Sequence, residues 1–150
     1  MARFSRKIYK AVLVGLFILA GTNACKDDYT SIVPYMYVNF DFNPTNYIEF
    51  KVPGGAVYFP NPGYGGIIVI NNWGDEYTPY LAFDATCTHE VSSTVRVAVT
   101  ENGSGIAVCP ECGSKFLLFG SNGNPIMGPA AEPLRQYHAN LVGGRIYISN

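Results

Sequence analysis

Two short loops, each with a pair of metal-ligating side chains, constrain this chain more than any other feature. The first loop offers Cys87 and His89, the second offers Cys109 and Cys112, and 19 residues (90–108) lie between the two pairs. Three thiolates and one imidazole suit zinc or an iron–sulfur cluster far better than a hard cation, which prefers oxygen ligands. The sequence therefore predicts a four-ligand metal centre held by two loops.

The remaining cysteine, Cys25, follows a segment that is typical of an export signal. Four basic residues occur among the first ten positions, and the apolar run 11–20 is shorter than the roughly 20 residues of a membrane-spanning helix. A Cys at this point resembles the lipidation site of bacterial lipoproteins, although the Leu that usually stands three positions earlier is replaced by Thr22. We expect residues 1–24 to be a signal peptide and Cys25 to carry the lipid.

The residues after Cys25 predict where in the cell the protein is located. Lys26-Asp27-Asp28 resembles the signal on surface-exposed lipoproteins of some Gram-negative bacteria, which is a Lys followed by acidic residues. We expect residues 25–34 to be a lipidated tether on an outer membrane lipoprotein exposed at the cell surface, with a periplasmic location as the alternative. Two other interpretations are an uncleaved signal anchor and a cleaved soluble protein in which Cys25 is incidental.

Lipidation of Cys25 would leave three cysteines, all in the two ligand loops. An odd number of cysteines in an exported domain does not suit a disulfide framework, whereas metal ligation uses all three. The alternative in an oxidising compartment is a disulfide between Cys109 and Cys112 in a domain without metal, with Cys87 left free.

Residues 35–150 form a single predicted domain of the all-β class. The chain contains 16 Gly and 10 Pro, 14% of it is aromatic, and short apolar segments alternate with turn residues. No amphipathic helix of useful length is expected. The whole chain has 10 basic and 11 acidic residues, and this near-neutral balance gives no indication of nucleic-acid binding. The expected strands are 35–42, 47–52, 56–59, 67–70, 80–83, 95–100, 106–108, 116–119, 136–141 and 145–149.

The expected strands 95–100 and 106–108 connect the two ligand loops. A Gly-containing turn at 101–105 makes them a hairpin, which would return the second loop to the side of the first. Gly113 and Pro110 suit the tight backbone of a metal-binding turn.

Both ligand loops resemble the cluster-binding boxes of the Rieske [2Fe–2S] proteins. The first box corresponds to Cys87-Thr88-His89-Glu90, and the second corresponds to residues 109–116. A third segment, 128–134, resembles the proline-containing loop that shields the cluster in that family; the residues carried over to this loop are Gly128, Pro129 and Pro133.

The resemblance covers roughly residues 67–150 and implies a fold. We expect a Rieske-like antiparallel β sandwich or barrel, with a small metal-binding subdomain at about 84–134 that is formed by two hairpin loops.

One departure from the Rieske pattern concerns the ligands. Carried over residue by residue, Cys87 and Cys109 match the two thiolates on one iron and His89 matches an imidazole on the other, but Cys112 stands where the family has a second His. The resemblance thus implies a Cys3His [2Fe–2S] centre. Its additional negative charge should lower the reduction potential below that of a normal Rieske centre.

Zinc is the alternative metal for the same four residues. Cys3His is an ordinary structural zinc set. An export signal that passes the chain unfolded also favours zinc, because a cluster would then have to be assembled after export.

The resemblance implies a membrane-tethered, one-electron carrier with an unidentified redox partner. No catalytic residues are expected, and with no substrate-binding extension the chain is expected to be an electron-transfer protein more than a complete enzyme. The alternative function is a structural zinc-binding, or metal-free, Rieske-fold interaction module on the cell envelope.

Overall fold

The computed structural model describes residues 31–72, 75–100, 104–120 and 122–150. The predicted signal peptide (1–24), Cys25 and the tether up to residue 30 lie outside the described residues. The compact unit begins at Ser31, four residues before the predicted domain boundary. The reason is that the Val33 side chain is buried, and its carbonyl oxygen accepts a hydrogen bond from Arg135. No helix in these ranges has the length and apolarity needed to cross a bilayer.

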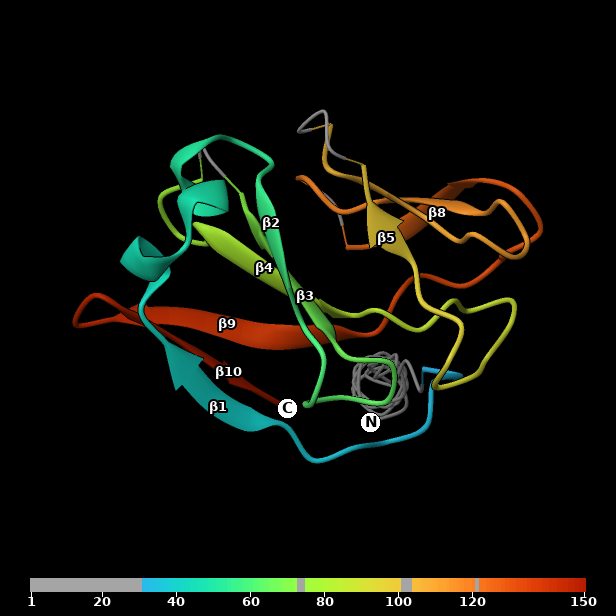
Figure 1. Ribbon diagram of the computed structural model, residues 1–150, viewed down its shortest axis with the longest axis horizontal. Coiled ribbons are helices and arrows are strands. Elements are labelled where there is room, and N and C mark those ends of the chain that lie inside the picture. Colours follow the sequence, from blue (N-terminus) through green and yellow to red (C-terminus); the bar gives the residue numbers. More distant parts are fainter. Residues whose placement is uncertain (1–30, 73–74, 101–103, 121) are drawn as a thin grey trace, which may run out of the picture. The chain divides into compact units, whose positions relative to one another are not determined.

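The described residues form ten strands in two antiparallel sheets, which confirms the predicted all-β class (Figure 1). The larger sheet has the order β1-β10-β9-β4-β3-β2, and the smaller sheet has the order β5-β6-β7-β8. The strand bounds are β1 Asn39–Phe42, β2 Ala56–Phe59, β3 Ile67–Asn71, β4 Tyr80–Asp84, β5 Ala98–Val99, β6 Ile106–Val108, β7 Lys115–Leu117, β8 Asn124–Met127, β9 Gln136–Val142 and β10 Arg145–Ser149.

Strand β3 is buried on both of its faces. Ile68 and Ile70 belong to a hydrophobic cluster that also contains residues of the smaller sheet, whereas Ile67 and Val69 belong to a second cluster with β9 and β10. Successive side chains of a strand point to opposite faces. The uninterrupted apolar run at 67–70 therefore supplies both clusters.

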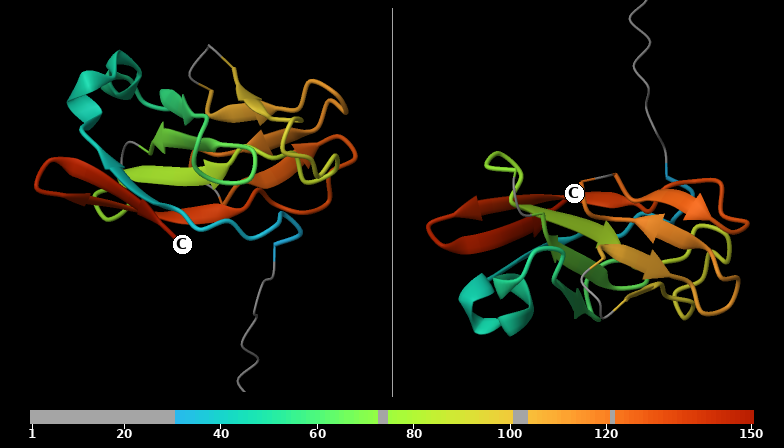
Figure 2. Two further views of the ribbon diagram at one scale, coloured as in Figure 1. Left: turned by 60° about the horizontal axis from the view of Figure 1, so that its bottom comes forward. Right: turned by 90° about the horizontal axis from the view of Figure 1, so that it is seen from above.

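The ligand loops lie at one end of the domain. Figure 2 shows the loops after β4, β6 and β8 at the opposite end of the domain from the turn between β9 and β10. That turn consists of Gly143 and Gly144, both with positive φ, and Val142 pairs with Arg145 across it. This geometry confirms the predicted hairpin, because two-residue hairpin turns with positive φ at both positions favour Gly.

The predicted strand at 47–52 is wrong. The chain forms two short 3-10 helices there, η1 (Pro44–Asn46) and η2 (Ile48–Lys51). The Asn43 side chain accepts a hydrogen bond from the backbone N–H of Thr45, and Pro44 provides a φ angle that suits the first helical position. Phe50 is buried while Ile48 is exposed, so the apolar residues do not share the face that a strand would give them.

Strand β8 was not predicted from the sequence, which indicated a Gly/Asn turn after residue 119; the strand contains Pro125. Proline has no N–H to donate and is disfavoured inside a sheet. The structure places β8 at the edge of the smaller sheet, where it pairs only with β7. An edge position leaves one side of the strand unpaired, so proline is tolerated there.

A buried carboxylate, Asp84, joins three parts of the larger sheet. It accepts hydrogen bonds from the backbone N–H groups of Tyr64 (2.8 Å), Gly65 (3.0 Å) and Thr86 (2.9 Å) and from the hydroxyls of Thr86 and Tyr137. Burial, and then the charge on Asp84, raise the pKa of Tyr137 above its ordinary value. Tyr137 therefore remains a hydrogen-bond donor across the physiological pH range.

We expect Asp84→Asn to lower the free energy of unfolding by about 2–4 kcal/mol. The amide removes the charge that strengthens these bonds, and its NH2 group would face donors instead of accepting from them. Urea denaturation followed by circular dichroism measures the change. The matched control is Asp41→Asn, since Asp41 forms an exposed ion pair with Arg145, and such pairs contribute at most about 1 kcal/mol. Equal losses in the two variants would contradict the central role of Asp84.

Candidate metal centre

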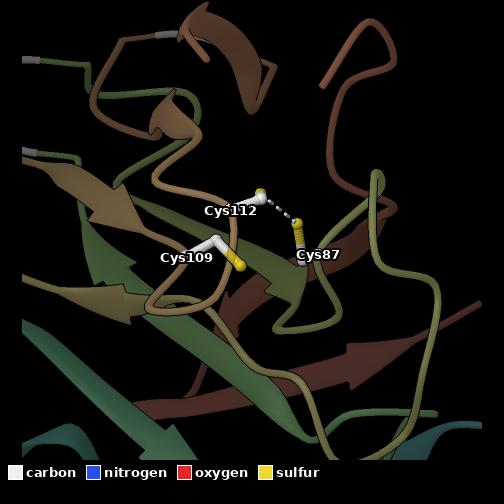
Figure 3. A group of neighbouring side chains, drawn as sticks. All are labelled: Cys87, Cys109 and Cys112. Carbon is white, nitrogen blue, oxygen red and sulfur yellow. Dashed lines mark hydrogen bonds between the residues drawn. The ribbon is translucent and has the colours of Figure 1, made fainter. Parts of the chain in front are cut away.

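Three predicted ligands, Cys87, Cys109 and Cys112, lie together (Figure 3). Their Sγ atoms are all within 4.8 Å of one another, and the Sγ atoms of Cys87 and Cys112 are 3.6 Å apart. Cys87 and Cys109 are buried, and Cys112 is half-buried. None of the three forms a disulfide in the structure.

Backbone pairing fixes the position of Cys87. The N–H of Cys87 donates to the Val95 carbonyl (3.3 Å), and the N–H of Val97 donates to the Ala85 carbonyl (2.8 Å). The chain therefore leaves β4, passes through Cys87, and returns so that residues 95–97 pair with residues 85–87 before β5 begins. Residues 88–94 form a closed excursion between these two paired segments.

A tight turn presents Cys109 and Cys112 from the second loop. The N–H of Cys109 donates to the Ser114 carbonyl (2.8 Å), and the N–H of Gly113 donates to the Cys109 carbonyl (3.0 Å). Gly113 has φ = +72°, so the expectation that this position suits glycine is confirmed. Figure 3 shows Cys109 and Cys112 on one loop and Cys87 on the other.

The segment predicted to shield the centre is bonded to both ligand loops. The N–H of Ala130 donates to the Ser114 hydroxyl oxygen (3.0 Å), and the Thr88 hydroxyl donates to the Glu132 carbonyl (2.6 Å). Gly128 lies so close to Ser114 that a Cβ at this position would be 2.5 Å from the Ser114 Cα. Of the two prolines in this loop, Pro129 is exposed and Pro133 is half-buried.

The fourth predicted ligand, His89, is not part of the group of three sulfur atoms. Its side chain is 44% exposed, and its Nε2 atom lies 3.8 Å from a carboxylate oxygen of Glu90. It lies two residues after Cys87 in the first ligand loop. Ligation by His89 stays a prediction.

The environment shifts the pKa values of two of the thiols, Cys87 and Cys112, in opposite directions. Burial raises the pKa of Cys87 to about 12, although the backbone N–H groups of Glu90 and His89 oppose the shift by hydrogen-bonding to its sulfur. For Cys112, burial acts in the same direction but is outweighed by hydrogen bonds from the Ser114 hydroxyl and N–H, so its pKa falls below the ordinary value.

Ser114 is a functional residue to which sequence reasoning gave no role. It is fully buried, and its hydroxyl oxygen lies 3.1 Å from the Cys112 sulfur. In the structure this oxygen accepts hydrogen bonds from the Cys112 thiol and from the Ala130 N–H; once Cys112 is a thiolate, the serine proton can point at the sulfur instead. A hydrogen bond of this kind stabilises a thiolate, and metal ligation requires the thiolate. The sequence feature that could have indicated this role is the position of Ser114 directly after Gly113, at the end of the second ligand loop.

The donor set fits a soft metal centre. Two sulfur ligands at about 2.3 Å from one tetrahedral ion lie about 3.8 Å apart, close to the distance between Cys87 and Cys112. Backbone and hydroxyl hydrogen-bond donors surround the sulfurs, as the charge of bound thiolates requires.

In reduced, metal-free protein at pH 7 we expect iodoacetamide to modify Cys112 before Cys87. A lowered pKa increases the thiolate fraction at neutral pH, whereas a pKa of about 12 keeps Cys87 protonated. Peptide mapping by mass spectrometry over time measures the order. Ser114→Ala should slow the modification of Cys112, since the variant lacks the hydroxyl donor. Reaction of Cys87 at the rate of Cys112 would disprove the assignment.

Comparison with known proteins gives matches in structure only. No protein-family model matches the chain, and no curated protein is similar to it in sequence. The ferredoxin of carbazole 1,9a-dioxygenase from Nocardioides aromaticivorans IC177 is 18% identical with a TM-score of 0.53, and the match covers 77% of this chain and 98% of that one. A chain in the complex of reduced oxygenase and oxidised ferredoxin of carbazole 1,9a-dioxygenase is 19% identical with a TM-score of 0.51, covering 75% and 93%.

A third solved structure is the plasma membrane Rieske protein PetC3 of the cyanobacterium Synechocystis PCC 6803. It is 27% identical, with a TM-score of 0.52, and the match covers 64% of this chain and 87% of that one. The chain therefore has the fold of the Rieske proteins and Rieske-type ferredoxins, and three cysteines converge in its ligand loops.

Proposed function

We propose that this protein is a membrane-tethered, Rieske-type electron carrier. Its centre would be a [2Fe–2S] cluster held by Cys87, Cys109, Cys112 and His89. The observation that carries the proposal is the convergence of three cysteine sulfurs from two loops of a Rieske fold. The segment 128–134, which is hydrogen-bonded to both ligand loops, supports the proposal.

The structural neighbours support an electron-transfer role with a protein partner. One of them belongs to a complex of a reduced oxygenase with an oxidised ferredoxin, and another is the ferredoxin of a dioxygenase of the same type. We infer that this chain passes single electrons to or from a second redox protein. Its own residues would hold the electron-carrying centre and would not transform a substrate.

The ligand set predicts a low reduction potential. When bound, the cluster would supply reversible one-electron chemistry. Cys112 replaces the neutral imidazole of an ordinary Rieske centre by a thiolate, and the added negative charge disfavours an additional electron. The hydrogen bonds from Ser114 to Cys112 offset part of this charge.

Membrane attachment belongs to the same proposal. Lipidation of Cys25 would tether the domain to the outer membrane, at the cell surface or on the periplasmic side. The support comes from the basic and apolar segment before Cys25 and from Lys26-Asp27-Asp28 after it.

A structural zinc site is the second candidate. In the residue-by-residue Rieske assignment, Cys87 and Cys112 belong to different irons. Their sulfurs lie 3.6 Å apart, which matches two ligands on one tetrahedral ion. This distance favours a single zinc ion that fastens the two loops together, in a module that binds another protein without carrying electrons.

Metal analysis of protein purified from its own host without refolding decides between the two candidates. We expect brown protein with two irons and two acid-labile sulfides per chain, and a paramagnetic signal after reduction. Colourless protein with one zinc per chain would overturn the electron-carrier proposal and support the structural module.

We expect Cys112→His to raise the reduction potential of the centre by about 100 mV or more, because a neutral imidazole replaces a thiolate. Protein-film voltammetry measures the shift. The matched control is Glu111→His, which removes the same charge from the neighbouring exposed position without changing a ligand. Equal shifts in the two variants would show that Cys112 acts through general electrostatics, and loss of iron from Cys112→His would show that the site does not accept Rieske ligands.

A further inference from the structure

Four large apolar side chains are exposed within six residues at the start of the compact unit. Ile32 is 47% exposed, Tyr35 64%, Met36 44% and Tyr37 74%. The surrounding stretch, 29–40, contains no charged residue. Scattered exposed apolar residues are ordinary, but a group of this density in one segment marks a surface that contacts something apolar.

This segment is held firmly against the domain. Val33 and Val38 are buried, and the N–H of Val38 donates to the side-chain oxygen of Asn150 (2.7 Å). The Asn150 side chain in turn donates to the Met36 carbonyl (3.1 Å), and Arg135 donates to the Val33 carbonyl (3.0 Å). The exposed side chains therefore project from a fixed backbone. Figure 2 (left) shows the segment in blue along one side of the domain.

The apolar surface continues beyond the segment. A shallow groove of about 380 Å³ adjoins Tyr37, and its apolar lining includes Phe40, Phe59, Pro60 and Pro62. The groove therefore extends the exposed aromatic segment onto β1 and the end of β2.

The sequence places this surface near the proposed lipid anchor. Ser31 follows Cys25 by six residues, and six residues span at most about 21 Å when fully extended. If Cys25 carries the lipid, as the proposed function holds, residues 32–37 begin at most about 25 Å along the chain from the bilayer surface.

We propose that residues 32–37 and the adjoining groove form a membrane-facing surface that rests at the headgroup level of a phospholipid bilayer. Tyrosine rings favour this level, since one end of the ring is apolar and the other is wet. The Arg135 guanidinium lies 5.2 Å from the centre of the Tyr35 ring and donates one hydrogen bond to the Val33 carbonyl. Its remaining N–H groups place a positive charge beside this segment that can meet a lipid phosphate.

The test uses the full lipidated chain, purified from membranes and reconstituted into phosphatidylcholine vesicles brominated on the upper part of their acyl chains. In a Trp73→Phe background, Tyr37→Trp places a fluorophore on the proposed surface. Tyr77→Trp is the matched control, because Tyr77 is 94% exposed in the loop between β3 and β4. We expect bromine to reduce the fluorescence of Tyr37→Trp by about half, since interfacial residues reach about 5–10 Å into the headgroup and acyl boundary, and to leave Tyr77→Trp unchanged.

The outcomes separate this inference from the proposal on which it rests. Mass spectrometry reports whether Cys25 is lipidated, and its absence would overturn both the anchor and the surface. Lipidated protein in which both fluorophores are unquenched, or equally quenched, would overturn the membrane-facing surface alone. Circular dichroism of each variant in vesicles, compared with the unaltered chain, shows that the fold is kept.

Discussion

Asp84 is the residue on which the arrangement of the domain depends. A carboxylate buried without partners would cost several kcal/mol, so β4 can end here only if donors converge on this position. Five hydrogen bonds do so, from the loop before β3, from the start of the first ligand loop and from β9. Because Cys87 is three residues further along, the same bonds set the direction in which the chain leaves β4 toward the metal centre.

Local sequence patterns predicted most of the sheet but not the parts that tertiary context decides. The apolar run of β3 and the Gly143-Gly144 hairpin follow from side-chain alternation and turn chemistry. The helical turns at 44–51 do not, because Ile48 and Phe50 alternate like strand residues while only Phe50 is buried. Similarly, Pro125 argues against a strand unless its position at a sheet edge is known.

At the candidate centre, too, local sequence patterns predicted some features and tertiary context decides the others. Spacing identified the three cysteines that the structure brings together, and the hairpin between the loops explains how they meet. The Ser114 hydrogen bonds depend on Ala130, sixteen residues away, which no local pattern reveals. The identity of the metal does not follow from the ligands, since a Cys3His set suits both iron and zinc.

The pairing of β1 with β10 has a consequence for how the domain folds. Val38 and Asn150, which bond just beyond the ends of these strands, are 112 residues apart in the sequence. Closing so long a loop costs chain entropy before the contacts form, which slows folding. During synthesis β1 therefore waits without its partner until β10 has emerged. Throughout that interval its unpaired edge is open to aggregation, and a chaperone that shields exposed strands would be of most use then.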